Sequence, residues 1–191
     1  MIAGRFGAAR RRAVSDDGSR VPHLPIDLVP ERLRILFVCA GNICRSPAAE
    51  AIFRYEALCA GITRRLEIDS AGTLPWYVGN PPDYRAIEHS RRRGYDLAPL
   101  RARQVGVADF ERFDWILAMD RRVLADLEDL RPAAFRGRLG LFLELAGSPD
   151  DVEVPDPYDQ GPAAFERMLD LVEKGSRLLV RRVCEPFGSA P

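Results

Sequence analysis

The sequence has almost no lysine, little histidine and no long apolar run. Lys174 is the only lysine among 28 basic residues, which leaves 27 arginines. This excess reflects codon choice more than selection for phosphate binding, because so many guanidinium groups cannot serve one site. No apolar stretch approaches the roughly 18 residues that a membrane-spanning helix needs. The formal net charge of +0 also gives no overall field that would favour nucleic acid.

Cysteine is scarce as well. The four cysteines, at positions 39, 44, 59 and 184, could form a disulfide framework, but a chain of 191 residues with 47% hydrophobic residues can bury a core without one. Cys39 and Cys44 have no second cysteine pair or histidine at zinc-ligand spacing, so no metal site is predicted. His23 and His89 match no motif and are expected on the surface. A reducing, cytoplasmic location is therefore indicated, with export by a non-classical route left open.

The chain divides into three parts by composition. Residues 1–31 are rich in arginine and proline and lack hydrophobic periodicity, which predicts a disordered leader outside the fold; a basic targeting or docking arm is the alternative. Residues 32–184 carry the periodic patterns of one globular domain. Residues 185–191 are expected to be a short flexible tail.

Short apolar runs alternate with helical patterns across this domain. Buried strands are predicted near residues 35–38, 66–70 and 115–119, and a weaker strand or strand–helix junction over 139–145. Helices are predicted from residue 46 to about 60, over 83–93, over 121–130 and from Pro162 onward, while residues 71–82 form a long loop. This alternation predicts an α/β fold: a single three-layer domain with a four-stranded parallel sheet and helices on both faces.

The turn between the first strand and the first helix has the properties of an anion site. Several backbone N–H groups converge there, where the helix dipole is positive. The turn contains Cys39, Ala40, Gly41, Asn42, Ile43, Cys44, Arg45 and Ser46, which we call the phosphate loop. Glycine takes backbone conformations forbidden to other residues, and asparagine tolerates the left-handed region. A ring of N–H groups around an oxyanion needs such conformations.

The side chains of this loop suit nucleophilic phosphate chemistry. Cys39 lies at the mouth of the ring, where helix N-terminal N–H groups stabilise a thiolate. Arg45, six positions on, offers a planar fork that matches two phosphate oxygens. Ser46 can donate its hydroxyl to the sulfur and help it leave. A single cysteine after an apolar strand is usually a small buried residue, but C-x5-R with an internal glycine, a strand before and a helix behind is specific.

Residues 38–47 (VCAGNICRSP) resemble the signature of the low-molecular-weight protein tyrosine phosphatases. The likeness continues through residues 69–73, 82–85, 101–103, 118–120 and 156–158 and the last helix, so it covers about residues 33–183 in matching order. It implies hydrolysis of a phosphotyrosine protein or peptide through a cysteinyl-phosphate, without cofactor or metal. Neither nucleic acid nor a membrane is expected as a partner, and the protein is expected to be a monomer.

The resemblance also implies roles for residues outside the phosphate loop. Asp156 lies between two prolines that restrict its backbone; alone it would indicate a turn, but within this family it corresponds to the general acid and base. Trp76 and Tyr158 resemble the aromatic walls of the substrate pocket. Asp159 replaces a second tyrosine of many relatives, which should alter preference among peptides.

Supporting residues of the loop are expected on the same basis. Asn42 and Ser70 resemble residues that hold the loop by hydrogen bonds, and Asp120 resembles a carboxylate that braces it, with a plain helix N-cap as the alternative. Leu100 stands where a histidine often joins this network, so other groups would have to rigidify the loop. Cys44 is close to Cys39 in the sequence, so the two thiols could form a protective, reversible disulfide. The alternative is that Cys44 only packs under the loop.

Several other activities compete with phosphotyrosine hydrolysis. Arsenate reductases share the scaffold but need two further cysteines in the middle of the chain, where this sequence has none between Cys59 and Cys184. Protein-arginine phosphatases carry threonine where this chain has Ile43, whose apolar side chain favours tyrosine. An inactive phosphate-binding module would have lost one of Cys39, Arg45 and Asp156.

Overall fold

The fold is built on four parallel strands. The structure is a computed structural model that describes residues 32–184, so the predicted leader (1–31) with His23, and the predicted tail (185–191), lie outside the described residues. The strands are β1 (Leu33–Cys39), β2 (Leu66–Gly72), β3 (Trp115–Ala118) and β4 (Arg138–Leu141), in the order β2-β1-β3-β4. All three pairings are parallel. The predicted four-stranded parallel sheet is therefore confirmed.

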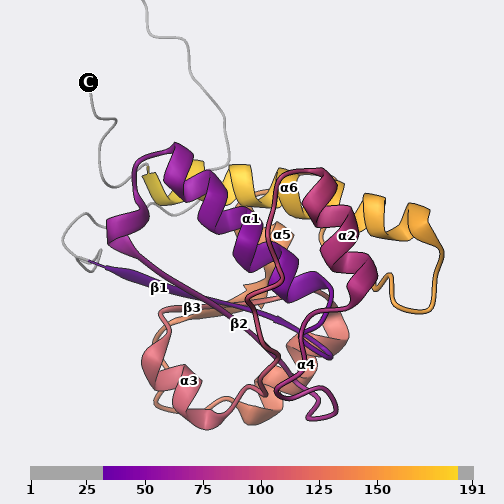
Figure 1. Cartoon of the computed structure of the whole chain (residues 1–191). Coiled ribbons are helices and arrows are strands. Elements are labelled where there is room, and N and C mark those ends of the chain that lie inside the picture. The colour runs from indigo at the N-terminus through magenta and orange to yellow at the C-terminus, as the bar shows by residue number, and fades with distance from the viewer. Residues whose placement is uncertain (1–31, 185–191) are drawn as a thin grey trace, which may run out of the picture.

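Helices cover both faces of this sheet (Figure 1). One side carries α1 (Arg45–Cys59), α2 (Tyr84–Arg92), α5 (Phe142–Ala146) and α6 (Pro162–Cys184), and the other carries α3 (Val107–Arg112) and α4 (Arg121–Leu130). A 3-10 turn, η2 (Thr63–Arg65), precedes β2. The three-layer prediction is confirmed. The weak pattern over 139–145 is the β4–α5 junction, whereas α3 was not predicted because it is only 6 residues long.

The two-residue period of β1 creates two cores. Ile35, Phe37 and Cys39 face the core beneath α1 and α6, whereas Leu36 and Val38 face the core above α3 and α4. The ring of Phe37 meets the edges of Phe53 and Phe142 at centroid distances of 5.5 and 5.2 Å, a favourable arrangement. Burial on both faces explains why β1 has a continuous apolar sequence.

The strand order places a crevice at the carboxyl end of β1. From β1 the chain goes to β2 on one side of the sheet, while β3 pairs with β1 on the other side. The strand order therefore reverses between β1 and β3. Ligands of open α/β sheets bind at such a point. The phosphate loop follows β1 there, and Asp120 follows β3 at the same edge. Met119 N–H donates to the Val38 carbonyl at 2.9 Å and ties the two ends together.

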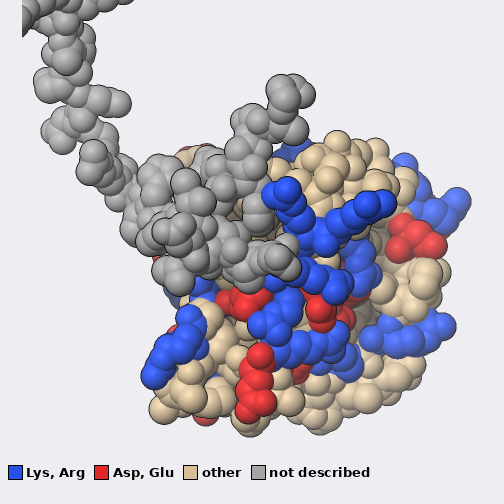
Figure 2. Space-filling view, turned by 90° about the vertical axis from the view of Figure 1, so that its left-hand side faces the viewer, with Lys and Arg blue, Asp and Glu red and all other residues tan. Residues whose placement is uncertain are grey.

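The surface away from this crevice is strongly charged. Basic and acidic side chains lie side by side on the face at the left of Figure 1, which is turned toward the viewer in Figure 2. Ion pairs at the amino ends of the strands include Arg34 with Asp114, at 2.9 Å. Among residues 32–184, no helix combines the length and the apolar character needed to cross a membrane.

The prediction that His89 lies on the surface is wrong. His89 is on the buried face of α2 with Ala86 and Ser90. Its ring stacks on Phe165 of α6 at a centroid distance of 5.5 Å, and its Nδ1 is hydrogen-bonded to the Glu166 carboxylate. An imidazole has one apolar face and a polar edge, so it can occupy a helix interface when a carboxylate lies at its edge.

Candidate active site

The phosphate loop turns sharply around the Cys39 sulfur. Asn42 has a φ of 55°, the only positive φ of a non-glycine residue among those that the structure describes. This left-handed conformation is tolerated by asparagine and turns its N–H toward Cys39 Sγ, at 3.3 Å. Cys39 is buried, with 2% of its surface exposed. The sulfur therefore lies at the bottom of the loop, with a backbone donor directed at it.

Ser46 contacts the sulfur from the first turn of α1. Its Oγ lies 3.1 Å from Cys39 Sγ and 3.1 Å from the Ala71 carbonyl oxygen, and it accepts a hydrogen bond from Asn42 Nδ2 at 2.9 Å. A hydroxyl carries one proton, so Ser46 donates either to the sulfur or to Ala71. This pair of acceptors allows the proton to turn toward the sulfur when negative charge develops on it.

A buried hydrogen-bond network holds Asn42 in place. Its Nδ2 also donates to Ser70 Oγ at 2.9 Å, and its Oδ1 accepts the Arg103 N–H at 2.9 Å. The Arg103 backbone thus contributes a donor to the loop, and Leu100 packs against the main core. The loop is held from three directions by residues far apart in sequence.

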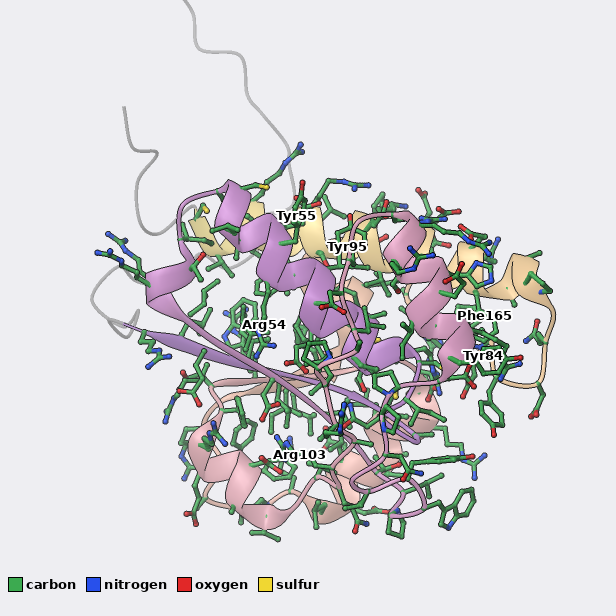
Figure 3. The ribbon with its side chains drawn as sticks, viewed as in Figure 1. Arg54, Tyr55, Tyr84, Tyr95, Arg103 and Phe165 are labelled. Atoms are coloured by element: carbon green, nitrogen blue, oxygen red, sulfur yellow. The ribbon has the colours of Figure 1, made fainter. Side chains whose placement is uncertain are left out.

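Glu50 extends this network and was not predicted from the sequence. Ser70 Oγ donates to Glu50 Oε2 at 2.5 Å, and the same carboxylate forms an ion pair with Arg54 one helical turn on. Figure 3 shows Arg54 under α1, on the side that faces the sheet. Burial raises the pKa of Glu50, while Ser70 and Arg54 lower it less. The position of Glu50 within the apolar face of α1 was the available signal.

Arg45 joins the phosphate loop to two carboxylates. Its side chain is only 3% exposed, its Nη1 is hydrogen-bonded to Asp120, and its Nη2 lies 2.6 Å from Asp156 Oδ2. Burial lowers the pKa of Arg45, but the charges of Cys39, Asp156 and Asp120 outweigh it and raise the pKa above its usual value. The guanidinium fork, expected to bind phosphate, thus contacts both carboxylates.

Asp120 fulfils both roles that the sequence left open. One carboxylate oxygen accepts the Val123 N–H at 2.8 Å and caps α4, and the other pairs with Arg45. The cap fixes the carboxylate, which then fixes the guanidinium. A cavity of about 170 Å³ opens beside this group, and its lining comprises Ala40, Arg45, Thr73, Leu74, Asp120, Arg122, Val123, Asp126 and Asp156.

The loop that carries Asp156 is attached to the sheet by a backbone contact and ordered by a local turn. Val154 N–H donates to the Met119 carbonyl at 2.7 Å, which attaches this loop to the end of β3. Asp156 Oδ1 accepts the Tyr158 N–H at 3.2 Å, an Asx-type turn that orients the carboxyl group. The Asp156 side chain is 47% exposed, so it is open to solvent and to an incoming substrate.

The two aromatic residues predicted to line the substrate pocket differ in their contacts. Tyr158 is hydrogen-bonded through its hydroxyl to the Tyr77 hydroxyl at 3.2 Å, and Tyr77 also lies against Gly41 of the phosphate loop. Trp76 is 73% exposed and has no aromatic contact within residues 32–184. Asp159 is exposed. Tyr77 was missed, although its place beside Trp76 in the 71–82 loop was a signal.

Comparison with known proteins identifies the family of this chain. The family model described as "Low molecular weight phosphotyrosine protein phosphatase" matches residues 34–186. The chain belongs to this family. A low molecular weight phosphotyrosine protein phosphatase of Schizosaccharomyces pombe is 43% identical over 136 residues, which cover 71% of this chain and 86% of that protein. The resemblance predicted from residues 33–183 is confirmed.

Solved structures of the phosphatase family share the fold. A crystal structure of protein tyrosine phosphatase from Entamoeba histolytica with Hepes in the active site has a TM-score of 0.76 and 35% identity, covering 80% of this chain and 97% of that one. A drosophila arginine phosphatase has a TM-score of 0.73 and 29% identity, covering 78% and 96%. The chain is thus an enzyme of the protein-tyrosine phosphatase class, on a scaffold that also occurs in a protein titled an arginine phosphatase.

Cys44 is the second thiol of the phosphate loop. It is 3% exposed and packs in the main core. Burial raises the pKa of Cys44, and the nearby Asp83 carboxylate raises it further, so this group remains a neutral thiol at physiological pH. Within residues 32–184, no cluster of three or more histidine, cysteine and acidic side chains has the arrangement of a metal site.

Proposed function

We propose that this phosphatase hydrolyses phosphotyrosine in proteins or peptides through a cysteinyl-phosphate, in a reducing cytoplasm and as a monomer. The observation that carries the proposal is the convergence of Cys39, Arg45 and Asp156 on one crevice. Arg45 belongs to the phosphate loop and touches Asp156 at 2.6 Å, although 111 residues separate them. This contact supports the roles of nucleophile, phosphate-binding fork and acid for the three residues.

The first half-reaction uses all three groups. The Cys39 thiolate attacks phosphorus and forms the S–P bond as the P–O bond to the tyrosine breaks, while Arg45 and the loop N–H groups bind the other phosphate oxygens. Asp156, in its protonated form, gives its proton to the leaving phenolate. Binding of phosphate to Arg45 releases Asp156 from its ion pair, which frees the carboxyl group for this transfer.

The second half-reaction reverses these roles. Asp156 takes a proton from a water molecule, whose oxygen attacks phosphorus as the S–P bond breaks. The sulfur departs as a thiolate, whose negative charge is stabilised by hydrogen bonds from the Asn42 N–H and the Ser46 hydroxyl. Inorganic phosphate is released and Cys39 returns to its starting state. Charge on the phosphoryl group is met by Arg45 and the loop donors, so the steps balance without another reactant.

The entrance favours a flat aromatic substrate. The rings of Tyr158 and Tyr77 contact each other beside the phosphate loop, and Ile43 of that loop contributes an apolar side chain that is 7% exposed. A phenyl ring gains from such contacts, whereas the charged guanidinium of phosphoarginine would lose hydration against Ile43 without a polar partner there. Protein-arginine phosphatase activity is the second candidate, because one structural relative is titled an arginine phosphatase.

The test compares three proteins on three substrates. The parent, Cys39→Ser and Asp156→Asn are assayed with 4-nitrophenyl phosphate and with matched phosphotyrosine and phosphoarginine peptides. We expect loss of turnover in Cys39→Ser and a reduction of about 10²–10⁴-fold on phosphotyrosine in Asp156→Asn. A higher kcat/KM for the phosphoarginine peptide would assign the second function. Parental turnover in Cys39→Ser would reject the mechanism for either substrate.

A further inference from the structure

The N-terminus of α2 lies between the phosphate loop and the loop of Asp156. Asp83, its N-cap, donates its backbone N–H to the Ile43 carbonyl of the phosphate loop at 2.8 Å. The Asp83 carboxylate accepts the Arg85 N–H at 2.8 Å, which closes the first turn of the helix. Burial raises the pKa of Asp83, but hydrogen bonds from Arg85 outweigh it and leave the pKa below its usual value. Asp83 is therefore a charged cap fixed to the phosphate loop.

Arg85 connects this cap to the other loop. Its Nε and Nη2 donate to the two Asp83 oxygens at 2.9 and 2.8 Å, a bidentate pair, and its Nη1 donates to the Tyr158 carbonyl at 2.9 Å. The guanidinium also lies 5.3 Å from the Tyr158 ring centroid and 4.8 Å from that of Phe165. Figure 3 shows Phe165 beside Tyr84 of α2.

The residue that Arg85 holds is the one that orients Asp156. Tyr158 N–H donates to Asp156 Oδ1, and Arg85 binds the carbonyl of the same Tyr158. A continuous path of hydrogen bonds and short covalent links thus runs from Ile43 through Asp83, Arg85 and Tyr158 to the carboxyl group. An arginine is needed for this geometry, because lysine lacks the planar fork that binds a carboxylate and a carbonyl at once.

We infer that Arg85 is a positioning residue. It holds the Asp156 carboxyl group at the position, next to the phosphate loop, from which it can protonate the leaving group. The inference rests on the proposed role of Asp156. Arg45 contacts Asp156, but in the proposed reaction its fork turns to the phosphate when substrate binds. The Arg85 contact to Tyr158 does not involve the phosphate, so it persists after Arg45 has released the acid.

The test uses two aryl phosphates that differ in their need for a proton. Phenyl phosphate has a poor leaving group, whereas 2,4-dinitrophenyl phosphate releases a stable phenolate that needs no acid. For Arg85→Met, we expect kcat/KM for phenyl phosphate to fall about 10–100-fold, since a displacement of about 1 Å costs about 10²-fold. For dinitrophenyl phosphate we expect a change within about 3-fold. Arg85→Lys should lie between the parent and Arg85→Met.

A second comparison separates positioning from general damage. The double variant Arg85→Met with Asp156→Asn should lose no more on phenyl phosphate than Asp156→Asn alone, because residues that act as a unit are not additive. The control is Arg91→Met on the same helix, because the exposed Arg91 side chain is described as bonded to Glu88 and not to either loop. It should retain parental kcat/KM on both substrates.

The outcomes distinguish the inference from the proposed function. Equal losses on both aryl phosphates, or losses that multiply in the double variant, would overturn the role of Arg85. So would parental kinetics of Arg85→Met on phenyl phosphate while Asp156→Asn is impaired. If Asp156→Asn itself showed no loss on phenyl phosphate, the proposed acid would be wrong. Thermal unfolding of each variant identifies a loss of activity that is caused by misfolding. If Arg85→Met misfolds, the two aryl phosphates are compared in Arg85→Lys instead.

Discussion

Gly72 is the position where a single methyl group should damage the catalytic loop most directly. It ends β2 opposite Cys39 in the sheet register. A Cβ at this position would lie 2.6 Å from the Ala40 carbonyl oxygen, against 3.4 Å at ordinary contact, a shortfall of 0.8 Å. It would also lie 3.0 Å from the Asn42 nitrogen. The obstructing atoms are backbone atoms of the phosphate loop, which cannot rotate away as a side chain can.

Neither side of this contact can retreat freely. Gly72 N–H donates to the Arg103 carbonyl at 2.9 Å, and the Gly72 carbonyl accepts the Val105 N–H at 2.8 Å. The Ala40 carbonyl accepts the Leu74 N–H at 2.9 Å. Overpacking of this kind costs about 1–3 kcal/mol of the free energy of unfolding. A shift approaching 1 Å in the loop should lower kcat/KM by about 10–100-fold.

The assay measures urea unfolding and kcat/KM for 4-nitrophenyl phosphate in Gly72→Ala. Gly161→Ala is the control, because a Cβ there meets no atom within 4 Å and its φ is not positive. The control should stay within about 0.5 kcal/mol and about 2-fold of the parent. Parental stability and activity in Gly72→Ala would show that the close approach of β2 to the loop does not constrain the site.

Three further predictions concern the network, the second thiol and the rim. Because burial raises the pKa of Glu50, its stabilising contribution is present below the unfolded pKa and is lost as pH rises through the folded pKa. Glu50→Gln should therefore gain stability relative to the parent between about pH 5 and about pH 8 in urea unfolding; a constant difference would contradict the shift. Cys44→Ser should make peroxide inactivation irreversible by thiol, and recovery equal to that of the parent would reject a protective Cys39–Cys44 disulfide. Asp159→Tyr should change kcat/KM among phosphotyrosine peptides but hardly change it for 4-nitrophenyl phosphate, whereas equal effects on both would exclude a role in peptide selection.

The strand, turn and helix that form the phosphate loop could be predicted because they are neighbours in the sequence. Cys39, Arg45 and Ser46 lie within eight positions, and local rules link a buried strand, a tight turn and a helix N-terminus to anion binding. The alternation of strands and helices likewise predicted a parallel sheet, since each pattern is local. Asp156 was reached through the resemblance, because a proline-flanked aspartate is otherwise only a turn.

One sequence interpretation failed because it considered a residue without its helix. His89 was expected on the surface for lack of a motif, although it shares the buried face of α2 with Ala86 and Ser90. Leu100 left open which groups hold Asn42. The backbone N–H of Arg103 is one of them, and it carries no side-chain signal.

The sequence alone thus determined which chemical groups follow one another along the phosphate loop. The tertiary structure decided which distant residues contact that loop. Glu50 beneath Ser70, Tyr77 beside Gly41 and Arg85 between two loops each depend on contacts across the fold. Local patterns report which backbone conformations a segment prefers. They contain no information about which distant carboxylate or carbonyl will lie within hydrogen-bond distance, because that depends on how the helices pack on the sheet.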